Sequence, residues 1–112
     1  MLEISSESIN NVLVISLIGR LDGITSKTFI DKTNEPEMST FSRIVLDCKD
    51  LNYISSEGLR VMLMAAKKAK SLGGSLTLCA VNAAVNEVMM ISGFGALFGV
   101  HSNVQDAIAA IS

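Results

Sequence analysis

Strand-like runs alternate with helix-like segments along this 112-residue chain, and the alternation constrains its fold more than any other feature. Runs rich in Val, Ile and Leu occupy residues 2–8, 12–18, 43–47, 75–81 and 97–100. Segments whose apolar residues repeat at helical spacing lie between and after these runs. Strands that alternate with helices are typical of a mostly parallel sheet covered by helices. The sequence therefore predicts an α/β fold with a mixed sheet of about four or five strands and about four helices.

Turn and cap residues predict where these elements begin and end. Asn10-Asn11 favours a turn between the first two strands, which then form an antiparallel hairpin. Polar interruptions at 19–23 and 47–50 should end the second and third strands. The main helix is expected at about 57–72. Other helix boundaries are expected at Thr25 or Ser26, Pro36, Gly73-Gly74, Asn82, Gly93 and a Ser102-x-x-Gln105 capping box.

Composition indicates one domain spanning residues 1–112, without a linker or internal repeat. Hydrophobic residues make up 49% of the chain and the net charge is −2. The only dense basic cluster, Lys67, Lys68 and Lys70, suits the end of a helix, so no direct nucleic-acid contact is predicted. Met1 opens no signal peptide, and the apolar stretch 88–100 is shorter than a membrane helix of about 20 residues. We expect a cytoplasmic protein without membrane insertion.

Signatures of catalysis are mostly missing. Cys48 and Cys79 lack the paired spacing of metal ligands and are predicted to be reduced, buried residues. His101 is the only histidine, which excludes a two-histidine metal site. A serine hydrolase using Ser56 and His101 would need a GxSxG elbow, which is absent. The sequence therefore predicts no enzyme, no catalytic residue, no metal and no cofactor.

Residues 53–61 gather two hydroxyls and a carboxylate where a strand should become the main helix: Ser55, Ser56 and Glu57. One interpretation is structural, because Ser is a common helix N-cap and Glu in the first turn suits the helix dipole. The other is functional, because free N–H groups at a helix start accommodate a phosphate, so a serine there can be modified without unfolding the domain. Taken alone, the residues favour the cap and leave both interpretations open.

Several segments resemble, in matching order, the STAS domains of anti-sigma factor antagonists. Residues 19–22 (GRLD) are similar to the Gly-x-Leu-Asp loop of that family, and 45–54 resemble its third strand and the approach to the helix. Residues 54–59 (ISSEGL), followed by Val61 and Leu63, are similar to its Asp-Ser-[Ser/Thr]-Gly-Leu segment. The glycines at 73–74 and residues 91–98 also fit. The resemblance covers nearly the whole chain and implies a STAS fold.

The resemblance also implies a site and a mechanism. Alignment on Gly58 and Leu59 places the phosphoacceptor of the family at Ser56, with Ser55 as the alternative. The chain departs from the family at Ser55, where Asp is usual, and at Glu57, where Ser or Thr is usual. The partner surface is expected to comprise Arg20, Asp22, Ser55, Ser56, Glu57, Gly58, Arg60, Val61 and Met64.

In the implied mechanism, the unmodified protein binds an anti-sigma factor, often a serine kinase, and so releases a sigma factor for transcription. Phosphorylation separates the complex, and a serine phosphatase restores it. A second hypothesis keeps the fold and makes the chain an unphosphorylated accessory subunit of a larger complex, in lipid transport or stress sensing. A small enzyme with a serine nucleophile is the third and weakest hypothesis, because the sequence offers no base for it.

Overall fold

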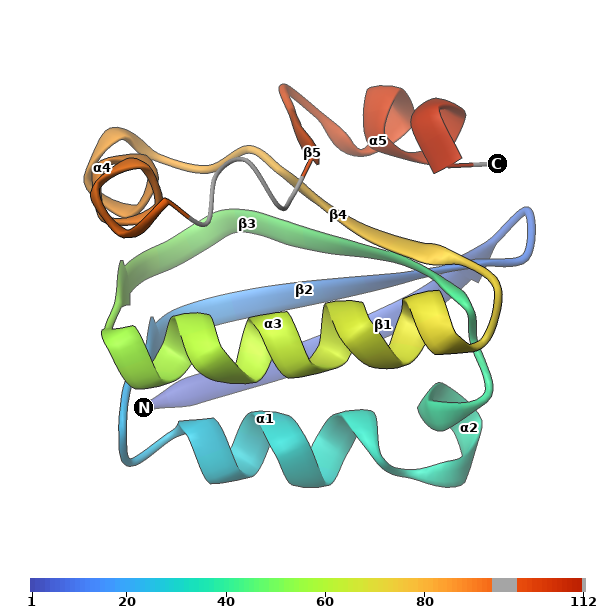
Figure 1. Ribbon diagram of the computed structural model, residues 1–112, viewed down its shortest axis with the longest axis horizontal. Coiled ribbons are helices and arrows are strands. Elements are labelled where there is room, and N and C mark those ends of the chain that lie inside the picture. The colour runs from blue at the N-terminus through green and yellow to red at the C-terminus, as the bar shows by residue number, and fades with distance from the viewer. Residues whose placement is uncertain (94–98, 112) are drawn as a thin grey trace.

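The computed structural model describes residues 1–93 and 99–111, and there it has a five-stranded sheet with helices on both faces (Figure 1). The strands are β1 (Leu2–Ile9), β2 (Val12–Leu21), β3 (Arg43–Ile54), β4 (Ser75–Cys79) and β5 (Gly99–His101). The helices are α1 (Ser26–Thr33), α2 (Pro36–Ser39), α3 (Ser56–Ser71), α4 (Ala83–Ser92) and α5 (Val104–Ile111). The sheet order is β1-β2-β3-β4-β5, antiparallel between β1 and β2 and parallel elsewhere. The predicted mixed α/β fold is confirmed.

The opening hairpin forms at the predicted turn. Asn10 and Asn11 have φ angles of 53° and 65°, and positive φ at both central residues is the backbone that a tight hairpin turn requires. Asn adopts this conformation more readily than most residues with a side chain. The turn sets the register of β1 against β2, with Ile9 opposite Val12.

The two central strands are longer than the sequence predicts. The interruption expected at 19–23 and the turn expected at 47–50 are wrong, because β2 continues to Leu21 and β3 to Ile54. The two strands remain paired with each other through these polar stretches, and their ladder contains two register shifts. This extension brings Arg20 opposite Tyr53 at the end of the ladder.

Helix boundaries follow the prediction in α4 and differ from it in α2 and α5. The N–H of Val85 donates to Asn82 Oδ1 at 2.8 Å, and Gly93 ends α4 with a φ of 79°.

Pro36 does not end a helix, because it occupies the first turn of α2, where its missing N–H costs nothing. Asn103 caps α5 in place of the predicted Ser102: the N–H of Asp106 donates to Asn103 Oδ1 at 2.8 Å. The last predicted strand begins at residues outside the described part and is observed as β5.

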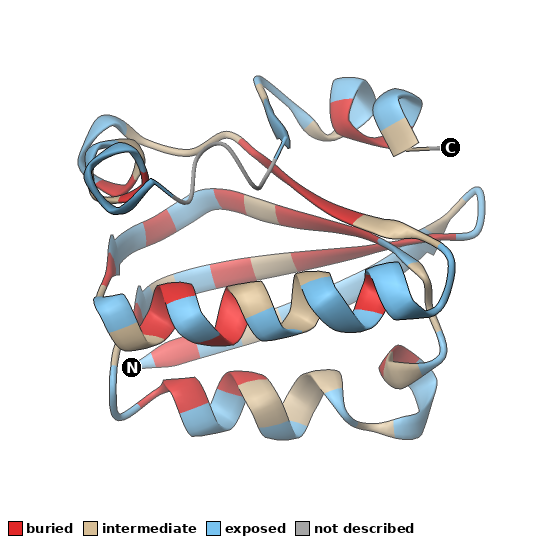
Figure 2. Cartoon of the chain, in the orientation of Figure 1, coloured by how far each residue is buried: buried red, intermediate tan, exposed pale blue. Residues whose placement is uncertain are grey.

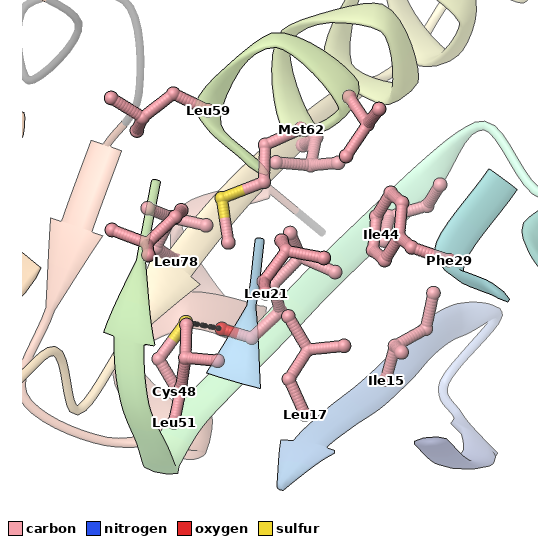
Figure 3. Packing of buried hydrophobic residues seen from close by; sticks show 14 of the residues in the cluster. Ile15, Leu17, Leu21, Phe29, Ile44, Cys48, Leu51, Leu59, Met62 and Leu78 are labelled. Atoms are coloured by element: carbon pink, nitrogen blue, oxygen red, sulfur yellow. Dashed lines mark hydrogen bonds between the residues drawn. The ribbon is translucent and has the colours of Figure 1, made fainter. Parts of the chain in front are cut away.

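Alternation along the strands builds a core on each face of the sheet (Figure 2). The larger core packs α1 and α3 against one face, and its side chains include Leu17, Leu21, Phe29 and Met62 (Figure 3). On the other face, Ala107 and Ile108 of α5 pack in a second core with residues of three strands: Val12 and Val14 of β2, Val45 of β3 and Cys79 of β4. No helix among the described residues is long and apolar enough to cross a membrane.

Both cysteines are free and buried, one in each core. Loss of solvation on burial raises the pKa of the Cys48 thiol to about 12 and that of the Cys79 thiol to about 11. Thiolates are the nucleophilic and metal-binding forms of cysteine, so these side chains act as small apolar residues near neutral pH.

Candidate functional site

The ends of β2 and β3 bring two distant stretches of sequence together. Leu21 pairs with Ile54 in the last rung of the ladder, and the N–H of Ser55 donates to the Leu21 carbonyl at 3.0 Å. The loop that begins at Asp22 and the first turn of α3 therefore lie side by side at one edge of the sheet (Figure 1). We call this region the Ser56 edge, defined by Arg20, Asp22, Ser55, Ser56, Glu57 and Arg60.

Ser55 is the residue that caps α3. It has extended backbone just before the helix, and its Oγ accepts a hydrogen bond from the N–H of Gly58 at 3.1 Å. This contact satisfies one of the N–H groups that a helix start leaves unpaired. The hydroxyl of Ser55 is half-buried and already has a structural role.

Ser56 occupies the next position and has no such role. Its side chain is exposed, and within the described part of the chain its hydroxyl makes no hydrogen bond. It stands at the first residue of α3, where the N–H groups and the helix dipole favour negative charge. The cap and the exposed hydroxyl, which the sequence could not separate, are thus two neighbouring serines.

Gly58 is buried because α3 starts in direct contact with β2. A Cβ atom at this position would lie 2.4 Å from the Leu21 carbonyl oxygen. Any larger residue would push the first turn of α3 away from the sheet and would move Ser56 with it. Gly58 therefore positions the edge and offers no side chain to a partner.

Val61 is also buried, with 2% of its surface exposed. This corrects the expectation that Val61 and Gly58 lie on an accessible surface. The apolar arc of α3 is wide, and α1 packs beside α3 on the same face of the sheet (Figure 1). Val61 belongs to the larger core and lines the same cavity as Phe29 and Ile30 of α1. Met64, one turn further along, is 47% exposed and stays accessible.

Asp22 organises the loop after β2. Its Oδ1 accepts hydrogen bonds from the N–H groups of Ile24 and Thr25, each at 3.0 Å. The bond from the Thr25 N–H is the main cause that holds the pKa of Asp22 below its ordinary value. The Thr25 hydroxyl in turn donates to the Arg20 carbonyl at 2.8 Å and so braces this loop. Thr25 is the N-cap residue of α1, at one of the two predicted positions, but its side chain makes no capping hydrogen bond to the helix.

Two arginines balance the two carboxylates of the Ser56 edge. Arg20 Nε lies 3.6 Å from Asp22 Oδ2, and Arg60 Nη1 lies 3.4 Å from Glu57 Oε1. The Arg20 guanidinium also stacks 4.3 Å from the centroid of the Tyr53 ring. Without modification, the edge therefore carries paired charges that sum to zero.

Two exposed apolar side chains were missing from the predicted surface. Ile24, in the loop after β2, is 88% exposed, and Tyr53, opposite Arg20, is 41% exposed. An apolar residue between Gly23 and Thr25 in a turn is a signal that could have identified Ile24 from the sequence, because little in a tight turn can cover it. Tyr53 could not be assigned, since β3 was expected to end before it.

Comparisons with known proteins identify the family. The family model of the STAS domain matches residues 3–107. BtrV of Bordetella bronchiseptica, named as a candidate anti-sigma factor antagonist, is 33% identical over 97% of this chain and 94% of its own. The anti-sigma F factor antagonist of Paenibacillus polymyxa is 30% identical over 98% of this chain and 95% of its own. The chain therefore belongs to the STAS domain family.

Solved structures show the same fold. The anti-sigma factor antagonist SpoIIAA of Bacillus matches in its unphosphorylated form with a TM-score of 0.76, at 21% identity over 95% of this chain and 93% of that chain. Its phosphorylated form matches with a TM-score of 0.71, at 19% identity over 96% and 98%. At these identities the likeness establishes the fold, and the family assignment rests on the sequence matches.

Proposed function

We propose that this protein is an anti-sigma factor antagonist that works by exchanging partners, and that Ser56 is its phosphoacceptor. The observation that carries the proposal is the exposed hydroxyl of Ser56, unbonded within the described chain, at the first position of α3. Two relatives that align over almost the full chain are named as antagonists of this type. The protein would act in the cytoplasm by binding, without catalysing a reaction.

Ser56 can be modified without loss of structure. The cap of α3 is supplied by Ser55, and the close packing of the first turn is supplied by Gly58. A phosphate on Ser56 would replace a hydroxyl that stabilises nothing, and it would stand where the helix dipole favours an anion. The folded state would therefore accept the modification.

The charge balance of the edge explains how the modification would change binding. Phosphorylation adds about −1.5 to −2 charges. Arg20 already pairs with Asp22 and Arg60 with Glu57, so neither arginine of the Ser56 edge is left to neutralise the added negative charge. An anti-sigma factor shaped for the neutral edge would have to desolvate this charge. A penalty of about 3 kcal/mol would weaken the complex by roughly 100-fold.

Phosphosite mapping tests the proposal directly. Protein isolated from its own cells, or incubated with the cognate serine kinase and ATP, should carry phosphate on Ser56, and the Ser56→Ala variant should carry none. Ser56→Ala should hold the anti-sigma factor as tightly as the unmodified protein, whereas Ser56→Asp should bind it less tightly. Phosphate on another residue, or equal affinity of both variants, would refute the assignment.

Glu57 supports a second candidate function, that of an unphosphorylated accessory subunit in a larger complex. The family usually has Ser or Thr at this position, and a carboxylate beside the acceptor opposes the addition of a phosphate. Its pairing with Arg60 reduces this opposition, which is why we favour the first proposal. The intact mass of the native protein separates the two functions, because the accessory role predicts no phosphate adduct under any growth condition.

A further inference from the structure

A cavity of about 230 Å³ lies between α1, α2, α3 and the sheet, away from the Ser56 edge. Its wall is formed mainly by apolar side chains, among them Ile15, Phe29, Ile44, Met38 and Val61. Figure 3 shows Ile15, Phe29 and Ile44 within the larger core. None of the residues that define the Ser56 edge lines this cavity.

The cavity is partly open to solvent and is larger than the voids that close packing leaves inside a protein. Protein interiors pack as densely as organic crystals and leave few voids larger than a water molecule. An engineered apolar cavity of about 150 Å³ in another protein binds benzene. By the same proportion, a volume of 230 Å³ has room for roughly nine carbon atoms. The cavity therefore fits a short alkyl chain.

The rim of the cavity has a positive charge. Lys68 lines the cavity and is exposed, and its Nζ donates to Asn34 Oδ1 at 3.2 Å. Among the described residues, no carboxylate lies within 4.0 Å of Lys68, and the nearby Glu35 is paired with Lys32 at 3.2 Å. Thr33 is occupied as well, because its hydroxyl donates to the backbone of α1. Lys68, Asn34 and Ser39, which also lines the cavity, are thus the polar side chains available to a ligand, and Lys68 is the charged one.

An apolar wall with a cation at its rim matches a ligand with an alkyl tail and an anionic head. We propose that this cavity binds a medium-chain carboxylate, with the tail among the side chains of α1, α2 and β2 and the head beside Lys68 and Asn34. This site goes beyond the proposed function and does not depend on it. It would give the protein a ligand in addition to its protein partners.

Octanoate is the probe for this site, followed by calorimetry and by ¹H–¹⁵N and methyl NMR spectra of the full chain. Octanoate should bind and shift the resonances of Phe29, Met38 and Ala65, and octylamine, whose head is positive, should bind least. Lys68→Gln should weaken octanoate about threefold to fivefold and leave octanol unchanged. Lys67→Gln is the matched control, since Lys67 is exposed on the same helix and does not line the cavity.

A second pair of variants tests the tail. Ala65 lines the cavity, whereas Ala66 packs against the same core without lining it, and both are half-buried. Ala65→Leu should fill the cavity and abolish binding of both octanoate and octanol, and Ala66→Leu should preserve it; thermal melts confirm that both variants fold. The proposal is overturned if octanoate fails to bind at millimolar concentration. It is also overturned if Lys68→Gln and Ala65→Leu bind octanoate as the wild type does.

Discussion

Replacing Ser55 with Ala tests the division of roles between the two serines at the start of α3. The change removes the Oγ that accepts from the Gly58 N–H at 3.1 Å and leaves that N–H buried against β2 without a partner. Loss of a serine N-cap costs about 1 kcal/mol, within a range of roughly 0.5 to 2 kcal/mol. Burial of Gly58 favours the upper part of this range, because solvent cannot easily replace the lost bond.

The matched variant is Ser56→Ala. This side chain is exposed and makes no hydrogen bond to the described residues, so the free energy of unfolding should change by less than about 0.5 kcal/mol. In a chain of 112 residues, 1 kcal/mol corresponds to about 4 °C in Tm, from an unfolding entropy of roughly 2.1 cal/mol/K per residue. A loss in the upper part of the range, about 1 to 2 kcal/mol, should therefore lower the Tm of Ser55→Ala by about 4 to 8 °C, whereas the Tm of Ser56→Ala should stay within about 2 °C of the wild type.

Urea denaturation followed by circular dichroism measures the same difference at 25 °C. Both variants should keep the m-value of the wild type, and only the midpoint of Ser55→Ala should fall. If Ser56→Ala were the less stable variant, Ser56 would be the cap, and the reasoning that leaves it available for modification would fail.

Three further predictions concern other residues described above. Gly58→Ala should lower the free energy of unfolding by about 1 to 3 kcal/mol in urea melts, because its Cβ would lie 2.4 Å from a backbone oxygen; Gly23→Ala, with no atom within 4 Å of its Cβ, should not. The pKa of Asp22 is lowered from 3.8, so its carboxylate stabilises the fold above about pH 4, and this contribution disappears as the pH falls through the folded-state pKa. Asp22→Asn should therefore lose less stability than the wild type on acid titration, and an equal loss would contradict the assignment. Cys48 and Cys79 should react with a thiol reagent at pH 8 only after unfolding, because burial raises the pKa of both; rapid labelling of the native protein would show that one of them is accessible.

Local signals in the sequence predicted the order of the elements and several of their ends. The turn at Asn10-Asn11, the capping bond of Asn82 to Val85 and the stop at Gly93 each involve residues close in sequence, so they can be predicted from the neighbouring residues. The extension of β2 and β3 could not be predicted in this way. Their polar ends are held by pairing with each other, across about 30 residues of intervening chain.

The burial of Gly58 and Val61 corrects the surface that the sequence predicted around Ser56. The strand-to-helix transition at Ser55 and Ser56 was identified from the sequence. Which of the two serines caps α3 was not, because it depends on the exact residue at which the helix begins, and sequence patterns do not define helix ends to one residue. The burial of Val61 was missed because it depends on the packing of α1 beside α3, a tertiary contact. Residues 94–98, which include part of the family resemblance, lie outside the described chain.

The placement of Ser55 and Ser56 has a consequence for how such a protein can diversify. The Ser55 hydroxyl holds the first turn of α3, whereas the Ser56 hydroxyl is exposed to solvent. Mutations that accumulate at position 56 should therefore have little effect on the stability of the fold. Proteins that diverge from a common ancestor with this fold could then gain, lose or change a modification site at this position without any change in the fold.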